Sequence, residues 1–312
     1  MIRKFFPLFV ISFFLFAACG NSKKKLVDSA PLISKTYKDS KGRTLKLPKE
    51  PARIISLAPN ITESLFAIGG TEKLVGRSQA CDYPEAAKQI PVVITYPSLD
   101  IEQLWSMVPE LVLATDEIYG PDAIATLEQR GVPVFVQTYK TFEEIYKGIE
   151  TLGMIVSKEE RAKIVVDSLK LLAKNIQKAS EPMPKYRTVI IVAEEPLKVI
   201  GGEGYMHEMI EKAGGSNIFA DKKEAYPTIS IEELLEKQPE YIILPTDDIN
   251  AYPRLIAAYP YLQTVPADVN HQVFSVSPDE FYRPGPRTME GLMHLTTILH
   301  TQLTRDSLLN VK

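Results

Sequence analysis

The sequence predicts an α/β protein with two lobes, each built on a mostly parallel sheet, joined by a single long helix. Three observations lead to this prediction: strand and helix patterns alternate along the chain, one long helical pattern lies near its middle, and a fifteen-residue motif occurs twice. Alternating strands and helices are typical of parallel sheets that helices cover on both faces. With 312 residues, of which 45% are hydrophobic, the chain can build one large or two medium-sized cores.

The N-terminus has the pattern of an export signal. Arg3 and Lys4 precede an apolar run over residues 5–18, and two small residues directly before Cys19 resemble a bacterial lipobox. The run is shorter than the roughly 20 residues that a membrane-spanning helix needs. We therefore expect a lipoprotein signal peptide over 1–18 and a lipid on Cys19. An ordinary signal peptide with an incidental cysteine is the alternative.

Charge and cysteine content narrow the class of protein further. Removal of the signal peptide leaves 34 basic residues against 39 acidic ones, a net charge of −5 that does not indicate a nucleic-acid partner. If Cys19 carries lipid, Cys81 has no partner for a disulfide, so core packing must hold the fold together. Residues 19–34 are polar and lack periodicity, which predicts a flexible tether.

The first lobe is predicted over 35–156. It opens with a hairpin around a Lys41-Gly42 turn, and a buried strand at 53–57 follows. Asn60 and Glu63 have the spacing of a capping box, which predicts a helix start. Further strands are expected at 111–115 and 132–136.

The second lobe is predicted over 184–312, after a connecting helix over 157–183. That segment has a second capping-box spacing, from Ser157 to Glu160, and then runs for about six turns without Gly or Pro. Strand patterns resume at 187–192, 241–244 and 272–276, and an amphipathic helix is expected from about Arg287 to Leu303.

The repeated motif is the most specific signal in the chain. The segment that starts at Tyr96 matches the segment that starts at Tyr226 with a constant offset of 130 residues and seven identities in fifteen positions. Each copy predicts a helix start, because Asp100 and Ser230 stand where an N-cap residue is expected. The shared residues are Tyr, Pro, Ile, Glu, Leu, Pro and Glu.

Two residue types in the motif suggest function. Glu102 and Glu232 fall in the first helical turn and should face solvent; as a duplicated pair they suit docking of a two-fold symmetric partner through its arginines. The alternative is that each merely stabilises its helix dipole. Tyr96 and Tyr226 lie on loops before these helices, where two lobes could present them across one cleft. One or both could instead cover its own lobe.

Several segments together resemble the periplasmic binding proteins of ABC importers for cobalamin, haem and ferric siderophores. The resemblance covers the chain from about Tyr37 to its end and implies two Rossmann-like lobes joined by one long helix. It implies a receptor without resident cofactor or catalytic site, monomeric, anchored by lipid in the periplasm, that hands a metal chelate to a permease dimer. The matching segments are 51–63, 75–84, 214–219 and 281–287.

Cobalamin-binding members of this family are the most similar. The similarity implies that Glu102 and Glu232 are docking acids, that Tyr96 and Tyr226 are cleft aromatics and that Asp279 and Arg283 are polar ligand contacts. Ala80 and Thr115 depart from the pattern, because aromatic residues are expected there. This departure leaves haem and ferric siderophores as alternative ligands.

Other interpretations carry less weight. Arg287 opens the last predicted helix, where a structural role is as reasonable as a ligand contact. No nucleophile elbow, phosphate loop or zinc motif is visible, which argues against an enzyme, and Asp82, Glu63 and Glu117 are interpreted as caps or solvated acids. The histidines are scattered, so no metal site is expected; His207 could contact haem iron or simply begin a helix.

Overall fold

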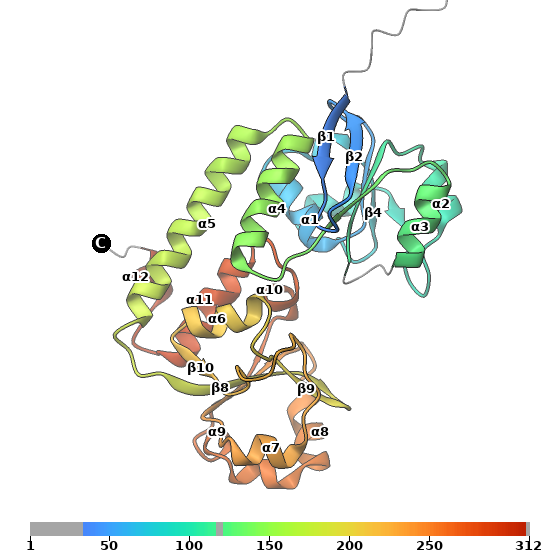
Figure 1. The fold of residues 1–312 in the computed structure, drawn as a ribbon. Helices are drawn as coiled ribbons and strands as arrows, with labels where there is room; N and C mark the ends of the chain where they lie inside the picture. Colours follow the sequence, from blue (N-terminus) through green and yellow to red (C-terminus); the bar gives the residue numbers. More distant parts are fainter. Residues whose placement is uncertain (1–33, 117–120, 310–312) are drawn as a thin grey trace, which may run out of the picture. The chain divides into compact units, whose positions relative to one another are not determined.

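Two five-stranded sheets form the framework of the protein in a computed structural model that describes residues 34–116 and 121–309 (Figure 1). The predicted signal peptide, the predicted lipidation site at Cys19 and nearly all of the predicted tether lie outside the described residues. Within those residues, no helix has both the length and the apolar character needed to cross a membrane.

The first sheet has the strand order β5-β4-β3-β6-β7, and all its strands are parallel. Alternate residues of its strands face opposite sides, as the pleat requires. Leu111 and Leu113 pack with α1 and α4, whereas Val112 and Ala114 pack with α2 and α3. The elements are β3 (Ile54–Ser56), α1 (Pro59–Ala67), β4 (Leu74–Ser78), β5 (Val92–Val93), α2 (Ile101–Ser106), β6 (Leu111–Thr115), α3 (Pro121–Gln129), β7 (Val134–Gln137) and α4 (Phe142–Ile155).

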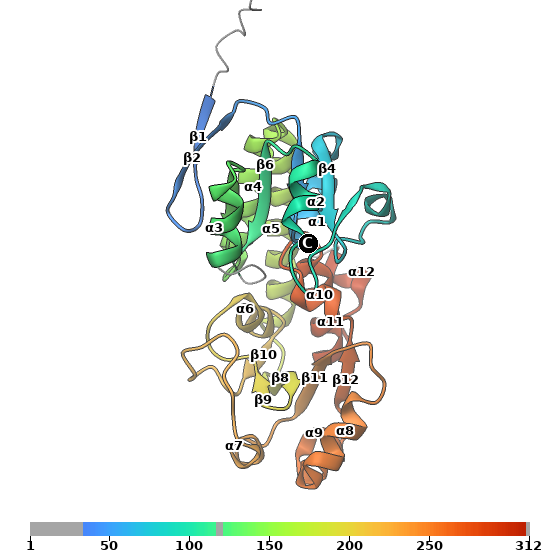
Figure 2. The ribbon, with the colours of Figure 1, turned by 90° about the vertical axis from the view of Figure 1, so that its right-hand side faces the viewer.

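The second sheet has the order β10-β8-β11-β12, with β9 added antiparallel to β8. Ile243 faces α6 and α11, whereas Ile242 and Leu244 face α7, α8 and α9, which lie at the bottom of Figure 2. The elements are β8 (Tyr186–Glu194), β9 (Leu197–Val199), α6 (Tyr205–Lys212), β10 (Gly215–Asn217), α7 (Ile231–Glu236), β11 (Tyr241–Pro245), α8 (Ala251–Ala258), α9 (Pro266–Val269), β12 (Val273–Val276), α10 (Pro278–Tyr282), α11 (Thr288–Leu299) and α12 (Arg305–Leu309).

The two sheets repeat one arrangement. In the first, β4, β3, β6 and β7 are neighbours in that order; in the second, β10, β8, β11 and β12 take the same places. Helix α2 precedes β6 as α7 precedes β11. The helices α2 and α7 begin 130 residues apart in the sequence, and so do the strands β6 and β11. The predicted fold class, two lobes with parallel-rich sheets, is confirmed.

The connecting helix α5 (Glu159–Ser180) packs Val166 and Ile176 into a core cluster that also contains residues of both sheets. Its predicted capping box is wrong, because Ser157 has a φ of 58° and Lys158 takes the N-cap position without a side-chain hydrogen bond. The described residues belong to one compact unit, so the predicted lobe boundaries stay a prediction.

The predicted N-terminal hairpin is present as β1 (Ser34–Lys38) and β2 (Thr44–Pro48), which pair antiparallel. Gly42 closes its turn with a φ of 77°, a conformation that costs glycine little. The C-terminal helix is shorter than expected, since α11 ends at Leu299 and a separate short helix, α12, follows.

His300 is a buried titratable residue at the end of α11. The residue is only 1% exposed, and its ring lies against the backbone of Ala213 and Gly214. The ring packs against Tyr186, with the centroids 5.9 Å apart. Burial lowers the pKa of His300 below its ordinary value, because loss of hydration penalises the imidazolium cation.

This histidine should make the free energy of unfolding depend on pH. The free energy of unfolding is not lowered by His300 above the unfolded-state pKa of about 6.5. It decreases as the pH falls toward the lower folded-state pKa, because in that range only the unfolded chain binds the proton. We expect His300→Leu, which removes the ring nitrogens, to weaken the decline in stability between about pH 7 and pH 5. Urea unfolding at several pH values measures this; identical pH dependence in both proteins would contradict the prediction.

Candidate functional site

The two copies of the repeated motif have the same backbone arrangement. Asp100 Oδ1 accepts a hydrogen bond of 2.8 Å from the backbone N–H of Gln103, and Ser230 Oγ accepts one of 3.1 Å from the backbone N–H of Glu233. Both N-cap predictions are therefore confirmed. Each helix has six residues and is followed by a residue in the left-handed region, Val108 or Gln238 in the respective copies.

The Pro-Glu pair at the end of each copy has a structural role that the sequence analysis missed. Glu110 accepts a hydrogen bond of 2.6 Å from the Ala52 amide, and Glu240 accepts one of 2.8 Å from the Arg187 amide. These contacts join the end of the motif to the start of the neighbouring strand, β3 or β8. An arginine at the start of each strand, Arg53 directly before β3 and Arg187 within β8, also donates to the carbonyl of the left-handed residue that follows the motif helix. The sequence did contain a signal for this role, because the two copies of the motif share Glu110 and Glu240.

Glu102 and Glu232 are exposed, as predicted, but their surroundings differ. The Glu102 side chain is 69% exposed and forms an ion pair of 2.5 Å with Arg130, which follows α3. Glu232 is also exposed, and no ion pair joins it to any other described residue. An ion pair between two exposed side chains contributes at most about 1 kcal/mol, so Arg130 can exchange for another cation.

Tyr96 and Tyr226 lie on loops that precede α2 and α7. Tyr96 is 80% exposed, so it does not cover its own lobe, and Tyr226 is 39% exposed. Of the two positions that depart from the family pattern, Ala80 is exposed and Thr115 is buried at the end of β6. The hydroxyl oxygen of Thr115 has no hydrogen-bond partner among the described residues.

A buried carboxylate joins the two halves of the protein. Glu63 of α1 is 4% exposed and accepts hydrogen bonds from two arginines of the C-terminal half. The distances are 2.8 and 2.6 Å from the Arg287 guanidinium and 3.1 Å from Arg283 Nη1. Arg283 also contacts Asp82 at 2.9 Å and Asp279 at 2.8 Å. We call these five residues the Glu63 network.

The Glu63 network pairs every charge that it buries, which is the condition under which buried ions are tolerated. Burial acts to lower the pKa of Arg283, but its hydrogen bonds to Asp82 and Glu63 raise it above the ordinary value. Burial acts to raise the pKa of Asp82, but hydrogen bonding and the charge of Arg283 lower it. The Arg287 guanidinium also lies 4.1 Å from the ring centroid of Tyr83, a cation–π contact.

The structure brings Asp279, Arg283 and Arg287 together, so the structural interpretation of Arg287 is supported. A ligand contact of Asp279 and Arg283 stays a prediction. The capping-box interpretation of Glu63 is wrong: Ala58 is the N-cap of α1, and Asn60 instead donates a hydrogen bond of 3.0 Å to the Pro284 carbonyl. The side chains of Glu63 and Asn60 therefore bind partners that are distant in the sequence and do not cap their own helix.

The remaining candidates lie elsewhere. His207 is near the start of α6, with Nδ1 3.2 Å from the Asn217 side-chain amide. Cys81 is buried, and burial raises the pKa of its thiol. Among the described residues, no group of three or more His, Cys, Asp or Glu side chains is placed to hold a metal ion.

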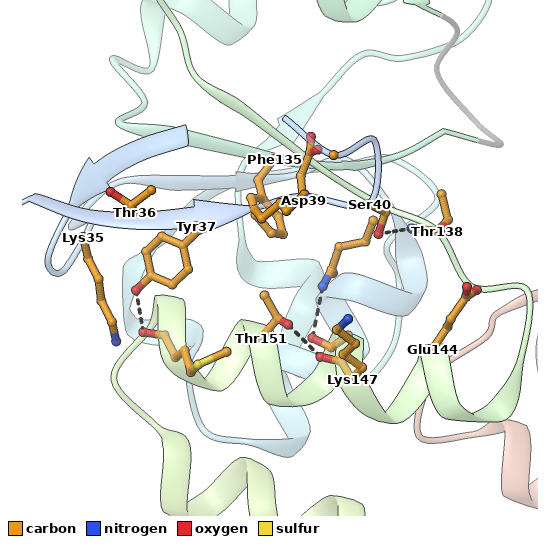
Figure 3. A pocket seen from close by; sticks show the side chains of 15 residues that line it. Lys35, Thr36, Tyr37, Asp39, Ser40, Phe135, Thr138, Glu144, Lys147 and Thr151 are labelled. Carbon is orange, nitrogen blue, oxygen red and sulfur yellow. Dashed lines mark hydrogen bonds between the residues drawn. The ribbon is translucent and has the colours of Figure 1, made fainter. Parts of the chain in front are cut away.

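A pocket of about 620 Å³ lies between the β1–β2 hairpin and α4 (Figure 3). Tyr37 of the hairpin donates a hydrogen bond of 2.9 Å to the Met154 carbonyl at one end, and Lys147 and Thr151 of α4 line the floor. None of the predicted ligand or docking residues is among those that line it. The pocket is therefore separate from the Glu63 network and from both repeat loops.

The chain is similar to known proteins over most of its length. A family profile described as periplasmic binding protein matches residues 54–280. The vitamin B12-binding protein of Vibrio cholerae is 29% identical over 268 residues, covering 86% of this chain and 96% of that protein. The uncharacterised ABC transporter substrate-binding lipoprotein YvrC of Bacillus subtilis is 28% identical over 303 residues, covering 94% of this chain and 95% of that protein.

Solved structures agree with this similarity. The crystal structure of the vitamin B12-binding protein BtuF of Vibrio cholerae aligns with a TM-score of 0.70 at 29% identity, covering 80% of this chain and 97% of that chain. A periplasmic heme-binding protein from Pseudomonas aeruginosa, 24% identical, aligns with a TM-score of 0.71 over 81% of this chain and 94% of that chain and shows the same fold. The resemblance inferred from the sequence motifs is confirmed.

Proposed function

We infer the function from the family: the chain belongs to the periplasmic binding proteins, and within them to the type that serves ABC importers of vitamin B12, haem and siderophores. We propose that it captures a large metal chelate for delivery to a permease. Cobalamin is the first candidate for this chelate. The observation that carries the proposal is the duplicated motif: each half of the protein presents one exposed tyrosine and one exposed glutamate at equivalent places.

The proposed ligand contacts are Tyr96, Tyr226, Asp279 and Arg283. The tyrosine rings combine a flat apolar surface with a hydroxyl group, which suits a large and partly apolar chelate. Arg283 offers donors for a carboxylate, amide or phosphate of the ligand, at the expense of part of the Glu63 network. Similarity to vitamin B12-binding proteins favours cobalamin.

Haem or a ferric siderophore is the alternative cargo. It is favoured by one specific feature, the small side chains of Ala80 and Thr115 at positions where the resemblance implies aromatic rings. The loss of two rings changes the surface that a corrin would stack against. The protein would act by binding alone, with no chemical change to the ligand.

The proposed delivery requires docking and proximity to the membrane. Glu102 and Glu232 would each meet a basic residue of one permease subunit, as the two-fold symmetry of such a dimer allows. A lipid on Cys19 would hold the monomeric receptor at a bacterial membrane in the periplasm, raising its local concentration near the permease without any added contact.

A thermal shift experiment on a lipid-free protein tests the ligand. At a concentration about 100 times its Kd, the true ligand adds about 2.7 kcal/mol to the free energy of unfolding, which raises the Tm by about 5 °C for a chain of this size. Cyanocobalamin, haemin and ferrichrome are to be compared on the wild type, on the variant Tyr96→Ala/Tyr226→Ala and on Tyr261→Ala, which removes another exposed ring, 73% exposed.

We expect a shift with cyanocobalamin that the double variant reduces and the control variant retains. A shift with haemin or ferrichrome instead would reassign the cargo within the family type. If none of the three compounds moved the Tm of the wild type, the receptor function would be rejected. The visible spectrum of protein purified from its native host identifies a retained ligand independently.

A further inference from the structure

The motif helices α2 and α7 differ in their exposed apolar side chains. Trp105 on α2 is 52% exposed, and Val108, which follows the helix, is 68% exposed. At the equivalent places 130 residues later stand Leu235, which is partly buried in its own core, and the polar Gln238. An exposed apolar pair therefore marks only the N-terminal copy of the motif.

Trp105 and Glu102 belong to one surface. They are three residues apart on α2, which places them on the same helix face, and a helical side chain leans toward the preceding turn. Leu104 between them points into the core and is fully buried. The surface thus combines a carboxylate with an indole ring, the kind of side chain that most often anchors protein interfaces.

The end of α2, where Trp105 and Val108 lie, is away from the edge of the sheet where ligands bind. The Arg53 guanidinium, directly before β3, donates hydrogen bonds to the Met107 and Val108 carbonyls, so the end of α2 lies at the amino-terminal edge of the sheet. Ligands of open α/β sheets bind at the opposite, carboxyl edge. Burial of the ligand therefore does not explain the exposed indole.

The backbone of Val108 adds an independent observation. Its φ of 49° lies in the left-handed region, where a β-branched residue is a genuine outlier. Gln238 has the same conformation, with a φ of 46°, without the β-branch. A glycine or asparagine would suit Val108's position better, so the exposed valine there costs stability.

We infer that Trp105 and Val108 form an apolar anchor beside Glu102 that inserts into one subunit of the permease, so that the two lobes dock differently. On the N-terminal lobe the partner surface has a basic residue next to an apolar hollow, and that basic residue takes the place of Arg130 on Glu102. On the C-terminal lobe Glu232 makes a mainly ionic contact. This inference rests on the proposed docking function of the two glutamates.

Uptake by the native host, with its own gene replaced by variants, tests the anchor. We expect Trp105→Ala to lower the uptake of radiolabelled cyanocobalamin about tenfold and Trp105→Leu, which copies the C-terminal motif, to lower it less, with the Kd for cyanocobalamin unchanged within about twofold. Leu171→Ala is the matched control, because Leu171 is 59% exposed on α5, on the far side of the protein from α2 in Figure 1. Uptake with Leu171→Ala should equal that of the wild type.

Val108→Gly separates docking from folding. We expect it to raise the Tm by about 1–3 °C, because glycine relieves the left-handed backbone, and yet to lower uptake severalfold. A merely structural residue would not lose uptake while gaining stability. The variant Glu102→Gln/Glu232→Gln distinguishes two ways of failing. If it lowers uptake while Trp105→Ala and Val108→Gly both leave uptake normal, the inference of an apolar anchor is overturned. If it also leaves uptake normal, the proposed docking function itself fails.

Cross-linking identifies the occupant directly. With benzoylphenylalanine at position 105 of the full chain, illumination of host membranes should give an adduct whose peptides come from a polytopic ABC permease subunit, and the same substitution at position 171 should not. An adduct between two copies of this chain would overturn the permease assignment in favour of self-association. Since Trp105 is the single tryptophan of the chain, a blue shift of its emission on docking provides a second measure.

Discussion

Replacement of Glu102 and Glu232 together by lysine is expected to abolish cobalamin uptake by cells while the purified protein keeps its affinity for cobalamin. Both carboxylates are exposed on first helical turns, outside the Glu63 network. Lysine would set a positive charge against the basic residue of each permease subunit, and like charges brought together at an interface cost several kcal/mol. Uptake should therefore fall by more than tenfold.

The control must carry the same change in net charge. Glu150→Lys/Glu181→Lys does so at two exposed positions, on α4 and at the end of α5. Its uptake should stay close to that of the wild type. A parallel loss of uptake and of cobalamin affinity in the Glu102/Glu232 variant would show that these residues belong to the ligand site, and the docking role would then be wrong.

Glu63→Gln is expected to lower the free energy of unfolding by about 3 kcal/mol, the size of loss that follows when one partner of a buried ion pair is removed. Glutamine keeps the shape of the side chain but has no negative charge. It leaves Arg283 and Arg287, with side chains only 15% and 12% exposed, facing a neutral amide. Asp279 still contacts both arginines, which limits the loss.

Urea unfolding at neutral pH measures this effect. The control is Glu85→Gln, because Glu85 is 82% exposed and, among the described residues, pairs only with Lys88 on the surface. That variant should lose less than about 0.5 kcal/mol. A loss below about 1 kcal/mol for Glu63→Gln would mean that the Glu63 network does not hold the two halves of the protein together.

Local patterns in the sequence were enough for several elements of the secondary structure and for the internal repeat. The N-caps at Asp100 and Ser230, the hairpin turn at Gly42 and the connecting helix α5 all depend on residues within one or two turns of each other. The matching positions of Tyr96 and Tyr226 and of the two exposed glutamates followed from the 130-residue offset alone.

Only the tertiary structure showed what long-range contacts do to individual side chains. Glu63 and Asn60 have the spacing of a capping box, yet their partners are 220 or more residues away in the chain. The pairing of Glu102 with Arg130 depends on where α3 ends beside α2. Among the described residues, no cation is placed to pair with Glu232 on α7.

The sequence by itself thus determined the fold class, the family resemblance and the duplicated surface residues, because short-range periodicity and a repeated motif encode them. The tertiary structure alone decided that Arg283, Arg287 and Asp279 surround Glu63, and that Glu102 and Glu232 have unequal surroundings. The physical reason is that charge pairing and exposure depend on which residues folding brings within a few ångströms, and local spacing does not report those distances.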